Sequence, residues 1–228
     1  ISAKLGARTT DRKRTFKRVA GRAIQLFSAN ENNVRQKQAP FIMATEVDGY
    51  RPAIASSIKM LMHKRGEAYG RRFKGYIESH PDKGWQSGSA KVWSGSTRGI
   101  WYWPCPDCGD WSSPNPLCTK GMHMPLSFDL RKSLPDQEAL DLVERTAALT
   151  CPHCGSQLGD AEKQTMNASG KWIFEGQVIL PDGTVSGAPI ASDTAGFWIH
   201  GTMSPFVSIN KLAREYASAL VYFKKTRK

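Results

Sequence analysis

The chain has 228 residues, 40% of them hydrophobic, which is enough for one large domain or for a domain with a smaller module. No apolar run approaches the length that spans a bilayer and no charged-then-apolar leader is visible, so we expect no membrane partner. The formal net charge of +12 predicts a polyanionic partner, and nucleic acid is the class that fits best.

The excess positive charge is concentrated at the N-terminus, where eight Lys and Arg residues up to Arg22 stand against Asp11 alone. Such a run is commonly a solvated arm, whatever the protein does, and it also suits contact with nucleic acid. Because residues 1–20 are polar and weakly periodic, we expect an irregular arm there, followed by a short strand over residues 23–27.

Residues 40–44 form a short apolar run that is typical of a buried strand in a parallel sheet. The acidic residues Glu46 and Asp48 follow it, at the strand end where α/β sheets bind their ligands. Residues 52–65 carry apolar side chains at helical spacing, and residues 73–77 predict another strand. Residues 82–97 are rich in Gly, Ser and Lys, so we expect a mobile loop before an aromatic strand over residues 100–103.

Two Cys-x-x-Cys segments, each followed by Gly, predict a tetrahedral zinc site formed by Cys105, Cys108, Cys151 and Cys154. The alternatives are a redox pair or a disulfide, and two copies with the same Pro and Gly positions favour zinc. Four thiolates leave no open position, so the site is expected to be structural rather than hydrolytic. Cysteines in metal spacing also indicate a reducing cytosol.

The fifth cysteine, Cys118, together with His123 offers a second ligand pair, but the regular spacing of the other four makes it a spare thiol. Zinc bound by four thiolates lowers the formal charge from +12 to +10. Residues 135–149 predict a helix capped by Ser133 or Asp136. Residues 170–174 and 195–201 predict strands, residues 181–183 a turn, and Ser208 caps a helix over residues 209–223. The tryptophans of this region either stack on bases or form a core, and a core is more common beside a small zinc module.

The order of these segments resembles one protein family, the lambda-type large terminase subunit of tailed phages, which drives DNA into capsids. Residues 41–50 are similar to its Walker B strand, which ends in Asp-Glu-Val-Asp in the family, and residues 79–81 to its Ser/Thr-Pro coupling segment. The paired Cys-Pro-x-Cys-Gly motifs also match. Further matching segments are Phe27-Ser28-Ala29-Asn30 with Val34-Arg35, Gly170-Lys171-Trp172, and Gly196-Phe197-Trp198-Ile199-His200-Gly201 with the following Ser204-Pro205-Phe206 and residues 212–216.

The resemblance implies an ATP-driven DNA translocase with a separate endonuclease domain, acting in the cytoplasm of the bacterial host. ATP and Mg²⁺ are its cofactors, and double-stranded DNA, the terminase small subunit and the capsid portal are its partners, with homo-oligomerisation left open. The expected fold is an α/β, partial P-loop-type ATPase sheet with an inserted or appended zinc-ribbon-like module. We place the later part of the ATPase domain at residues 1–100, the zinc module at 101–175, and a return strand and helix at 176–228.

The resemblance also assigns roles to single residues. Glu46 takes the place of the glutamate that orients and polarises the attacking water. Thr45 stands where the family has a Mg²⁺-binding carboxylate, and a hydroxyl is a weaker ligand for that ion. Asp48 replaces some of the lost charge, although in an extended strand it shares a face with Glu46 and points away from Thr45. The alternative is that both acids are solvated loop residues.

Three more residues are implied for the nucleotide site. Ser79 and His80 occupy the coupling position, where His80 either senses the nucleotide or is an ordinary surface residue. Arg35 supports the nucleotide pocket or, equally, makes a salt bridge or a phosphate contact.

Two parts of the family's machinery have no match in the sequence. It contains no Gly-x-x-x-x-Gly-Lys-Ser/Thr loop, so we expect the phosphate-binding loop before Ile1 and the nuclease domain after Lys228. The chain is then a fragment of the packaging ATPase. The alternatives are a non-enzymatic, zinc-stapled nucleic-acid-binding module or a degraded prophage remnant.

Overall fold

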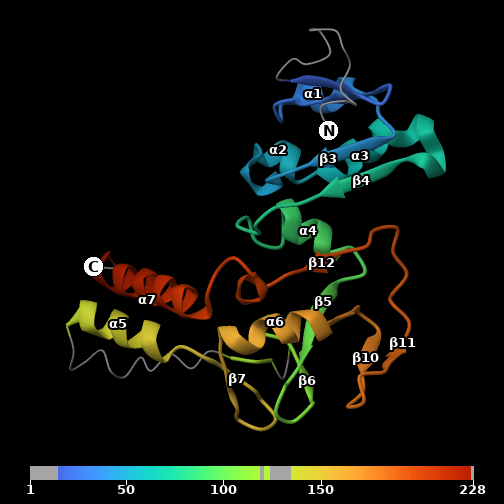
Figure 1. Ribbon diagram of the computed structural model, residues 1–228. Helices are drawn as coiled ribbons and strands as arrows, with labels where there is room; N and C mark the ends of the chain where they lie inside the picture. Colours follow the sequence, from blue (N-terminus) through green and yellow to red (C-terminus); the bar gives the residue numbers. More distant parts are fainter. Residues whose placement is uncertain (1–14, 119–120, 124–134, 227–228) are drawn as a thin grey trace. The chain divides into compact units, whose positions relative to one another are not determined.

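The computed structural model describes residues 15–118, 121–123 and 135–226 (Figure 1). They belong to two compact units, one ending at Ser94 and the other beginning at Gly95. The domain boundaries expected after residues 100 and 175 remain predictions.

The first unit begins with a β-hairpin of β1 (Phe16–Val19) and β2 (Arg22–Gln25). Ala20 and Gly21 both have positive φ, as the tight two-residue turn of a hairpin requires. The expected irregular arm is therefore wrong at residues 16–19, while residues 1–14 lie outside the described part. Helix α1 (Glu31–Gln36) follows, and the side chain of Asn30 caps it by accepting a hydrogen bond from Asn33 N–H.

The centre of the first unit is a pair of parallel strands, β3 (Phe41–Ala44) and β4 (Lys74–Ile77), which confirms the parallel pairing expected of residues 40–44. The expected burial of this strand is wrong, because Phe41 and Met43 are more than half exposed and only Ala44 is buried. Between them lie α2 (Pro52–Ala55), α3 (Ile58–Gly66) and the 3-10 helix η4 (Glu67–Arg72). In the described residues this sheet has two strands, so the larger sheet of a P-loop ATPase is not established.

Two expectations for this unit are corrected by the structure. The single helix over residues 52–65 is interrupted near Ser57, whose hydroxyl donates to the carbonyl of Ala53 and competes with regular helical pairing. The mobile loop over residues 82–97 instead contains helix α4 (Gly88–Ser94). Residues Ala44, Val47, Ile54, Ile58 and Met62 form the core of the unit.

The second unit is built on β5 (Gly99–Pro104), which pairs with three short strands: β6 (Trp111–Ser112), β9 (Lys171–Ile173) and β12 (Phe197–Trp198). Two hairpins accompany this sheet, β7 (Leu149–Thr150) with β8 (Gln157–Leu158) and β10 (Gln177–Ile179) with β11 (Val185–Gly187). The expected aromatic strand over residues 195–201 is shorter, because the 3-10 helix η6 (Gly201–Met203) follows it.

The fully buried Trp103 lies in the largest core of this unit, together with Met166, Met203 and two of the cysteines. Its indole N–H donates to Asn167 on α6 (Asp160–Ser169), a helix that the sequence reading missed. The rings of Trp101 and Trp172 pack edge to face, with their centroids 5.0 Å apart. The structure therefore favours the core interpretation of these aromatic residues over base stacking.

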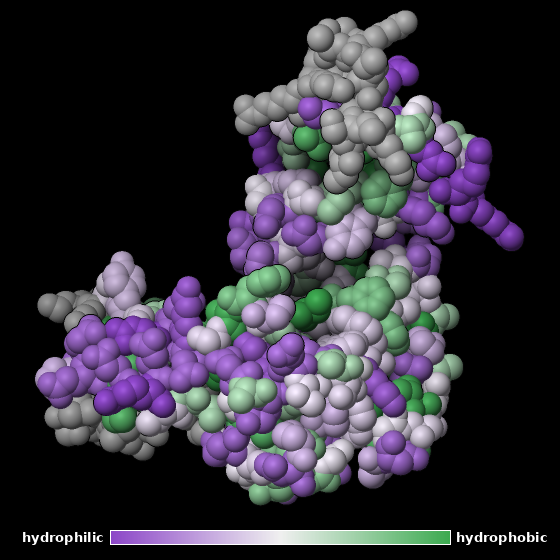
Figure 2. Space-filling view, in the orientation of Figure 1, coloured by the Kyte–Doolittle hydropathy of each residue, from purple (hydrophilic) through white to green (hydrophobic). Residues whose placement is uncertain are grey.

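The third part of this unit is a helix pair, α5 (Asp136–Thr146) and α7 (Ile209–Thr226), which pack on each other through Val143, Ala213 and Ala217. Hydrophilic residues gather over the two helices in Figure 2. The Ser208 cap of α7 is confirmed, since its hydroxyl accepts from Lys211 N–H at 3.1 Å. For α5, Ser133 lies outside the described residues and Pro135, not Asp136, occupies the cap position.

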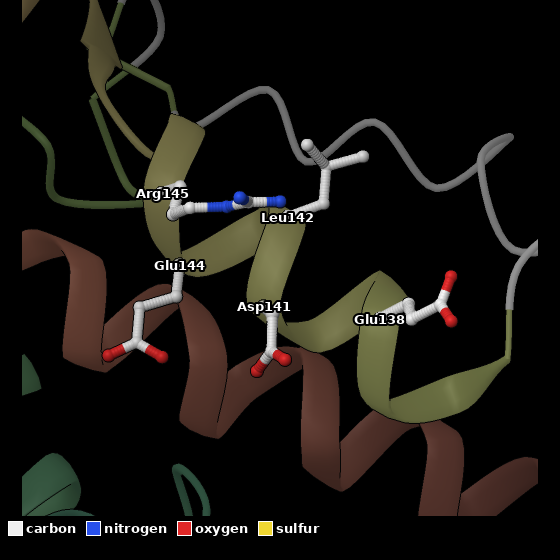
Figure 3. Close-up of a pocket in the computed structure, with 5 residues that line it drawn as sticks. All are labelled: Glu138, Asp141, Leu142, Glu144 and Arg145. Atoms are coloured by element: carbon white, nitrogen blue, oxygen red, sulfur yellow. The ribbon is translucent and has the colours of Figure 1, made fainter.

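A shallow hollow lies beside α5, and all of its lining residues come from that one helix (Figure 3). Asp141 and Glu144 point toward α7, where Arg214 contacts them at 2.6 and 2.7 Å. Arg145 and Leu142 do not point toward α7. The two acids are thus used in holding the helix pair together, and the hollow is a surface feature.

Candidate functional site

The expected catalytic residue, Glu46, lies just beyond the carboxyl end of β3. The chain leaves the extended conformation there, because Glu46 has φ 53° and ψ 44°, in the left-handed region. A residue other than Gly in this region is uncommon and often marks a functional site. The turn leads into the 3-10 helix η3 (Val47–Gly49), in which Val47 is fully buried.

This turn separates the two acids that the sequence placed on one strand face. The side chain of Glu46 is 66% exposed, whereas Asp48 is 2% exposed. The extended geometry assumed for them is therefore wrong, and so is the view of Asp48 as a solvated loop acid. Its carboxylate accepts hydrogen bonds from Ser89 and from Asp82 N–H, so it lies among donors of its own chain.

The coupling residues meet the end of β3, because β4 ends beside it. His80 Nδ1 lies 3.8 Å from a carboxylate oxygen of Glu46, with both side chains mostly exposed. Ser79 accepts a hydrogen bond from Asp48 N–H at 3.0 Å. The structure thus brings Glu46, Asp48, Ser79 and His80 to one strand end, with the exposed Thr45 next to them.

Arg35 has a different environment. It lies in the last turn of α1, where its guanidinium faces Glu31 at 3.6 Å, and its backbone carbonyl accepts a hydrogen bond from Arg65 of α3. The hydrogen bond from Arg65 joins α3 to α1, whereas the ion pair with Glu31 lies within α1 and is of the salt-bridging kind that the sequence left open for Arg35.

The four predicted zinc ligands form one cluster, in which the sulfurs of Cys105, Cys108, Cys151 and Cys154 all lie within 4.8 Å of one another. The two sulfur pairs that join the knuckles are 3.8 and 3.9 Å apart. A tetrahedron with metal–sulfur bonds of about 2.3 Å has edges of about 3.8 Å, so the cluster has the dimensions of a four-thiolate zinc site. The cysteines are therefore compatible with zinc.

The two knuckles have the same backbone geometry. In each, the N–H of the following Gly donates to the carbonyl of the first Cys, from Gly109 to Cys105 and from Gly155 to Cys151. Both glycines have φ close to 80°, a value that residues with a Cβ rarely adopt. His153 and Asp110 approach each other at 3.5 Å and join one knuckle to the other.

The four sulfurs lie close enough to influence one another's ionisation. The hydroxyl of Ser156, 3.1 Å from Cys154, and its backbone N–H lower the pKa of Cys154 to about 6. For Cys108, the Asp110 N–H lowers the pKa, but desolvation and the neighbouring sulfurs outweigh it and raise the pKa to about 12. Four thiols so close together therefore ionise together only with a positive ion among them.

The second ligand pair weighed from the sequence is not part of the cluster. The thiol of Cys118 donates to the Tyr102 hydroxyl at 3.4 Å, and burial is the main cause of the raised pKa of Tyr102. His123 pairs through its backbone with Thr150. Cys118 is thus separate from the four clustered cysteines among the described residues.

Sequence reasoning missed the partners of Asp48, because the Gly-Ser-rich stretch around Ser89 looked like a loop. The available signal was the sequence from Gly88 to Val92, in which a small polar residue precedes helix-forming residues. It also missed α6 and its buried Lys163, which pairs with Asp160 at 2.9 Å and donates to the carbonyl of Val207.

The parallel strand pair with a glutamate beyond its carboxyl end and the four-cysteine cluster are compatible with an α/β ATPase domain that carries a cysteine module. A family model described as phage terminase large subunit gpA, ATPase domain, matches residues 1–172, about three-quarters of the chain. The chain therefore belongs to this family. Comparisons with curated proteins and with solved structures gave no significant match. Within the described residues, every helix is too short or too polar to cross a bilayer.

Proposed function

We propose that residues 1–228 supply the catalytic glutamate and the coupling segment of a DNA-packaging ATPase. The observation that carries the proposal is the meeting of Glu46 with Ser79 and His80 at the end of two parallel strands. The family is that of an ATPase domain, which implies ATP and Mg²⁺ as ligands, so we assign the nucleotide site to this strand end.

The proposed role of Glu46 is to accept a hydrogen bond from water and orient it toward the γ-phosphate. The exposed carboxylate suits this task, because solvent reaches it and its own chain does not occupy it fully. His80 Nδ1 lies 3.8 Å from the Glu46 carboxylate and belongs to the segment that leaves β4. In this proposal the residue that orients water and the coupling segment lie at the same strand end.

The described residues fit a magnesium ion poorly. Thr45 is neutral, and the carboxylate of Asp48 is occupied by donors from its own chain. ATP and its metal, when bound, supply the reacting phosphoryl group and neutralise its charge. The 228-residue sequence contains no phosphate-binding loop of the Gly-x-x-x-x-Gly-Lys-Ser/Thr type.

We also propose that the cysteine cluster binds one structural zinc ion. The sulfur separations match a tetrahedral site, and Cys105 and Cys151 belong to the core that surrounds Trp103. The metal then joins two segments more than forty residues apart and completes a core rather than a catalytic centre.

The proposed nucleic-acid partner is double-stranded DNA, contacted through its phosphates by the first unit. Residues 1–94 hold 19 Lys and Arg against 7 Asp and Glu, whereas residues 95–228 hold 13 of each. Exposed basic residues follow one another at the end of α3, in η4 and at the start of β4: Lys64, Arg71, Arg72 and Lys74. Such a group attracts the phosphate backbone without reading sequence.

The rest of the packaging role follows from the family. The small subunit, the portal and a linked endonuclease are proposed partners, with action in the host cytoplasm. A non-enzymatic, zinc-stapled nucleic-acid-binding module is less well supported, because the zinc-bearing unit has no net charge to attract DNA.

The test is Glu46→Gln in a terminase subunit that contains these residues and a phosphate-binding loop. We expect ATP hydrolysis to fall at least about 100-fold with nucleotide binding retained, because loss of a general base costs about that much. The matched control is Glu67→Gln, which removes an exposed carboxylate of the same unit. Equal rates in both variants would refute the assignment. The chain of residues 1–228 alone should show no hydrolysis that depends on Glu46.

A further inference from the structure

The carboxylate of Asp48 is buried although it lies two residues after the exposed Glu46. Its Oδ1 accepts from the N–H and the hydroxyl of Ser89 at 2.7 and 3.0 Å, and its Oδ2 accepts from Asp82 N–H at 3.3 Å. All of these donors lie in the segment after β4. Hydrogen bonds to a buried charge are strong, and breaking them leaves that charge unpaired.

The backbone around Asp48 is joined to the same segment. Asp48 N–H donates to the Ser79 hydroxyl at 3.0 Å. Val47 N–H donates to the carbonyl of Glu78, whose own N–H donates to the carbonyl of Ala44. The turn that carries Glu46 is therefore linked to residues 78–89 through both its backbone and one side chain.

Gly88 is the residue that makes the contact with Ser89 possible. It has φ +63°, and a Cβ at this position would lie 2.0 Å from Asp48 Oδ1. Both the backbone conformation and the close approach require glycine. The start of α4 is thus shaped to receive the Asp48 carboxylate.

We propose that Asp48 is a positioning residue that couples the turn carrying Glu46 to the coupling segment and to α4. The proposal rests on the proposed role of Glu46. A displacement of Glu46 moves Asp48, and the hydrogen bonds of Asp48 carry that displacement to Ser79, Asp82 and Ser89. In this proposal Asp48 transmits movement between the strand end and α4. The sequence had suggested a different role, in which Asp48 adds negative charge to the metal site.

Hydrogen exchange on the zinc-loaded chain of residues 1–228 tests the link itself. Asp48→Asn removes the charge and leaves one acceptor oxygen for two backbone donors, so either Ser89 N–H or Asp82 N–H faces an amide N–H. Gly88→Ala obstructs the contact with Ser89 without changing any charge. We expect the amides of Asp82 and residues 88–94 to exchange at least about tenfold faster in both variants, since a hydrogen bond to a charged group changes an opening constant that much.

Two controls accompany this measurement. Residues 95–226 should exchange as in the parent chain, and Glu67→Gln should leave residues 79–94 unchanged. Ser89→Ala, which removes one donor only, should give a smaller increase and guards against variants that do not fold. Unchanged exchange at Asp82 and residues 88–94 in all three Asp48, Gly88 and Ser89 variants would overturn the proposal.

Kinetics of the terminase subunit with its phosphate-binding loop separate positioning from metal binding. For Asp48→Asn we expect kcat to fall about tenfold or more while KM for Mg-ATP stays within about twofold. A raised Mg²⁺ requirement with unchanged kcat would make Asp48 a ligand and refute the proposal. The proposal would also be refuted if the loss of activity in Asp48→Asn equalled the fraction of unfolded protein and if the activity returned on cooling. If Glu46→Gln retains full activity in parallel, the proposed function fails while the exchange result still stands.

Discussion

The two units of this chain differ in where their charge and their stability come from. The first unit holds the whole net charge of +12, and its core of small strands and short helices leaves Phe41, Met43 and Tyr76 about half exposed. The second unit is neutral and is built around Trp103 and four clustered cysteines. We propose that contact with a polyanion and water activation belong to the first unit, and that a metal ion binds only to the second.

This difference separates two properties that the sequence presented together. A basic protein with a four-cysteine motif is commonly interpreted as a zinc module that binds nucleic acid. Here the positive charge and the cysteines occupy different units. With four thiolates and one Zn²⁺ the neutral unit becomes slightly negative, so it suits contact with protein better than contact with phosphates.

The largest expected effect comes from removing the metal. We expect Cys105→Ser, or a strong chelator, to unfold the second unit, because structural zinc sites contribute on the order of 10 kcal/mol to folding. Hydrogen exchange should rise in the described strands and helices of the second unit and remain unchanged in β3, β4 and α3. The bound metal, measured by elemental analysis, should fall from one zinc per chain to none.

The matched control for that experiment is Cys118→Ser, which changes a cysteine outside the cluster. It should retain the zinc and the parent melting curve. If Cys105→Ser melts both units together, or neither, the division of stability between them is wrong.

A smaller effect is expected when basic residues of the first unit are removed. Arg71→Ala with Arg72→Ala should weaken binding to duplex DNA about uniformly across sequences and reduce the slope of log K against log salt by about 2, one for each lost phosphate contact. Fluorescence anisotropy at several salt concentrations measures both quantities. Arg145→Ala in the second unit removes one exposed positive charge and should leave both quantities unchanged. An equal loss from Arg145→Ala would show that the zinc-bearing unit also contacts DNA.

How much of the molecule the sequence predicted also differs between the units. The clustering of the four cysteines was predictable because their spacing and their glycines specify local turns, which do not depend on the rest of the fold. The strands β3 and β4 were predictable from short apolar runs, and so was the placement of Glu46 at a strand end. Patterns of this kind depend on residues that are adjacent in the sequence, so they can be identified before the tertiary fold is known.

The parts that were not predictable depend on contacts between distant residues. Asp48 was expected to lie on a strand face with Glu46, but the left-handed conformation of Glu46 turns it inward. Its partner Ser89 is forty-one residues away, in a stretch whose composition indicates a loop. Helix α4 begins where that carboxylate meets Gly88, so a long-range contact decides a local structure.

The smallest expected effect concerns the α5–α7 pair and tests whether the neutral unit gains anything from ion pairs beyond its metal. The hydrogen bond from Arg214 is the main cause of the lowered pKa of Asp141. A carboxyl whose folded pKa lies below its unfolded value of about 3.9 stabilises the fold above that value and loses this contribution as pH falls through the folded pKa. The loss is therefore expected below about pH 4, and it should be small because the pair is solvent-accessible.

An NMR titration should show the pKa of Asp141 returning toward its ordinary value in Arg214→Gln. Lys211→Gln, which leaves the Asp141 contact intact, should not change this pKa. An unchanged titration of Asp141 in Arg214→Gln would mean that Val143, Ala213 and Ala217 hold the helices together without help from the charges.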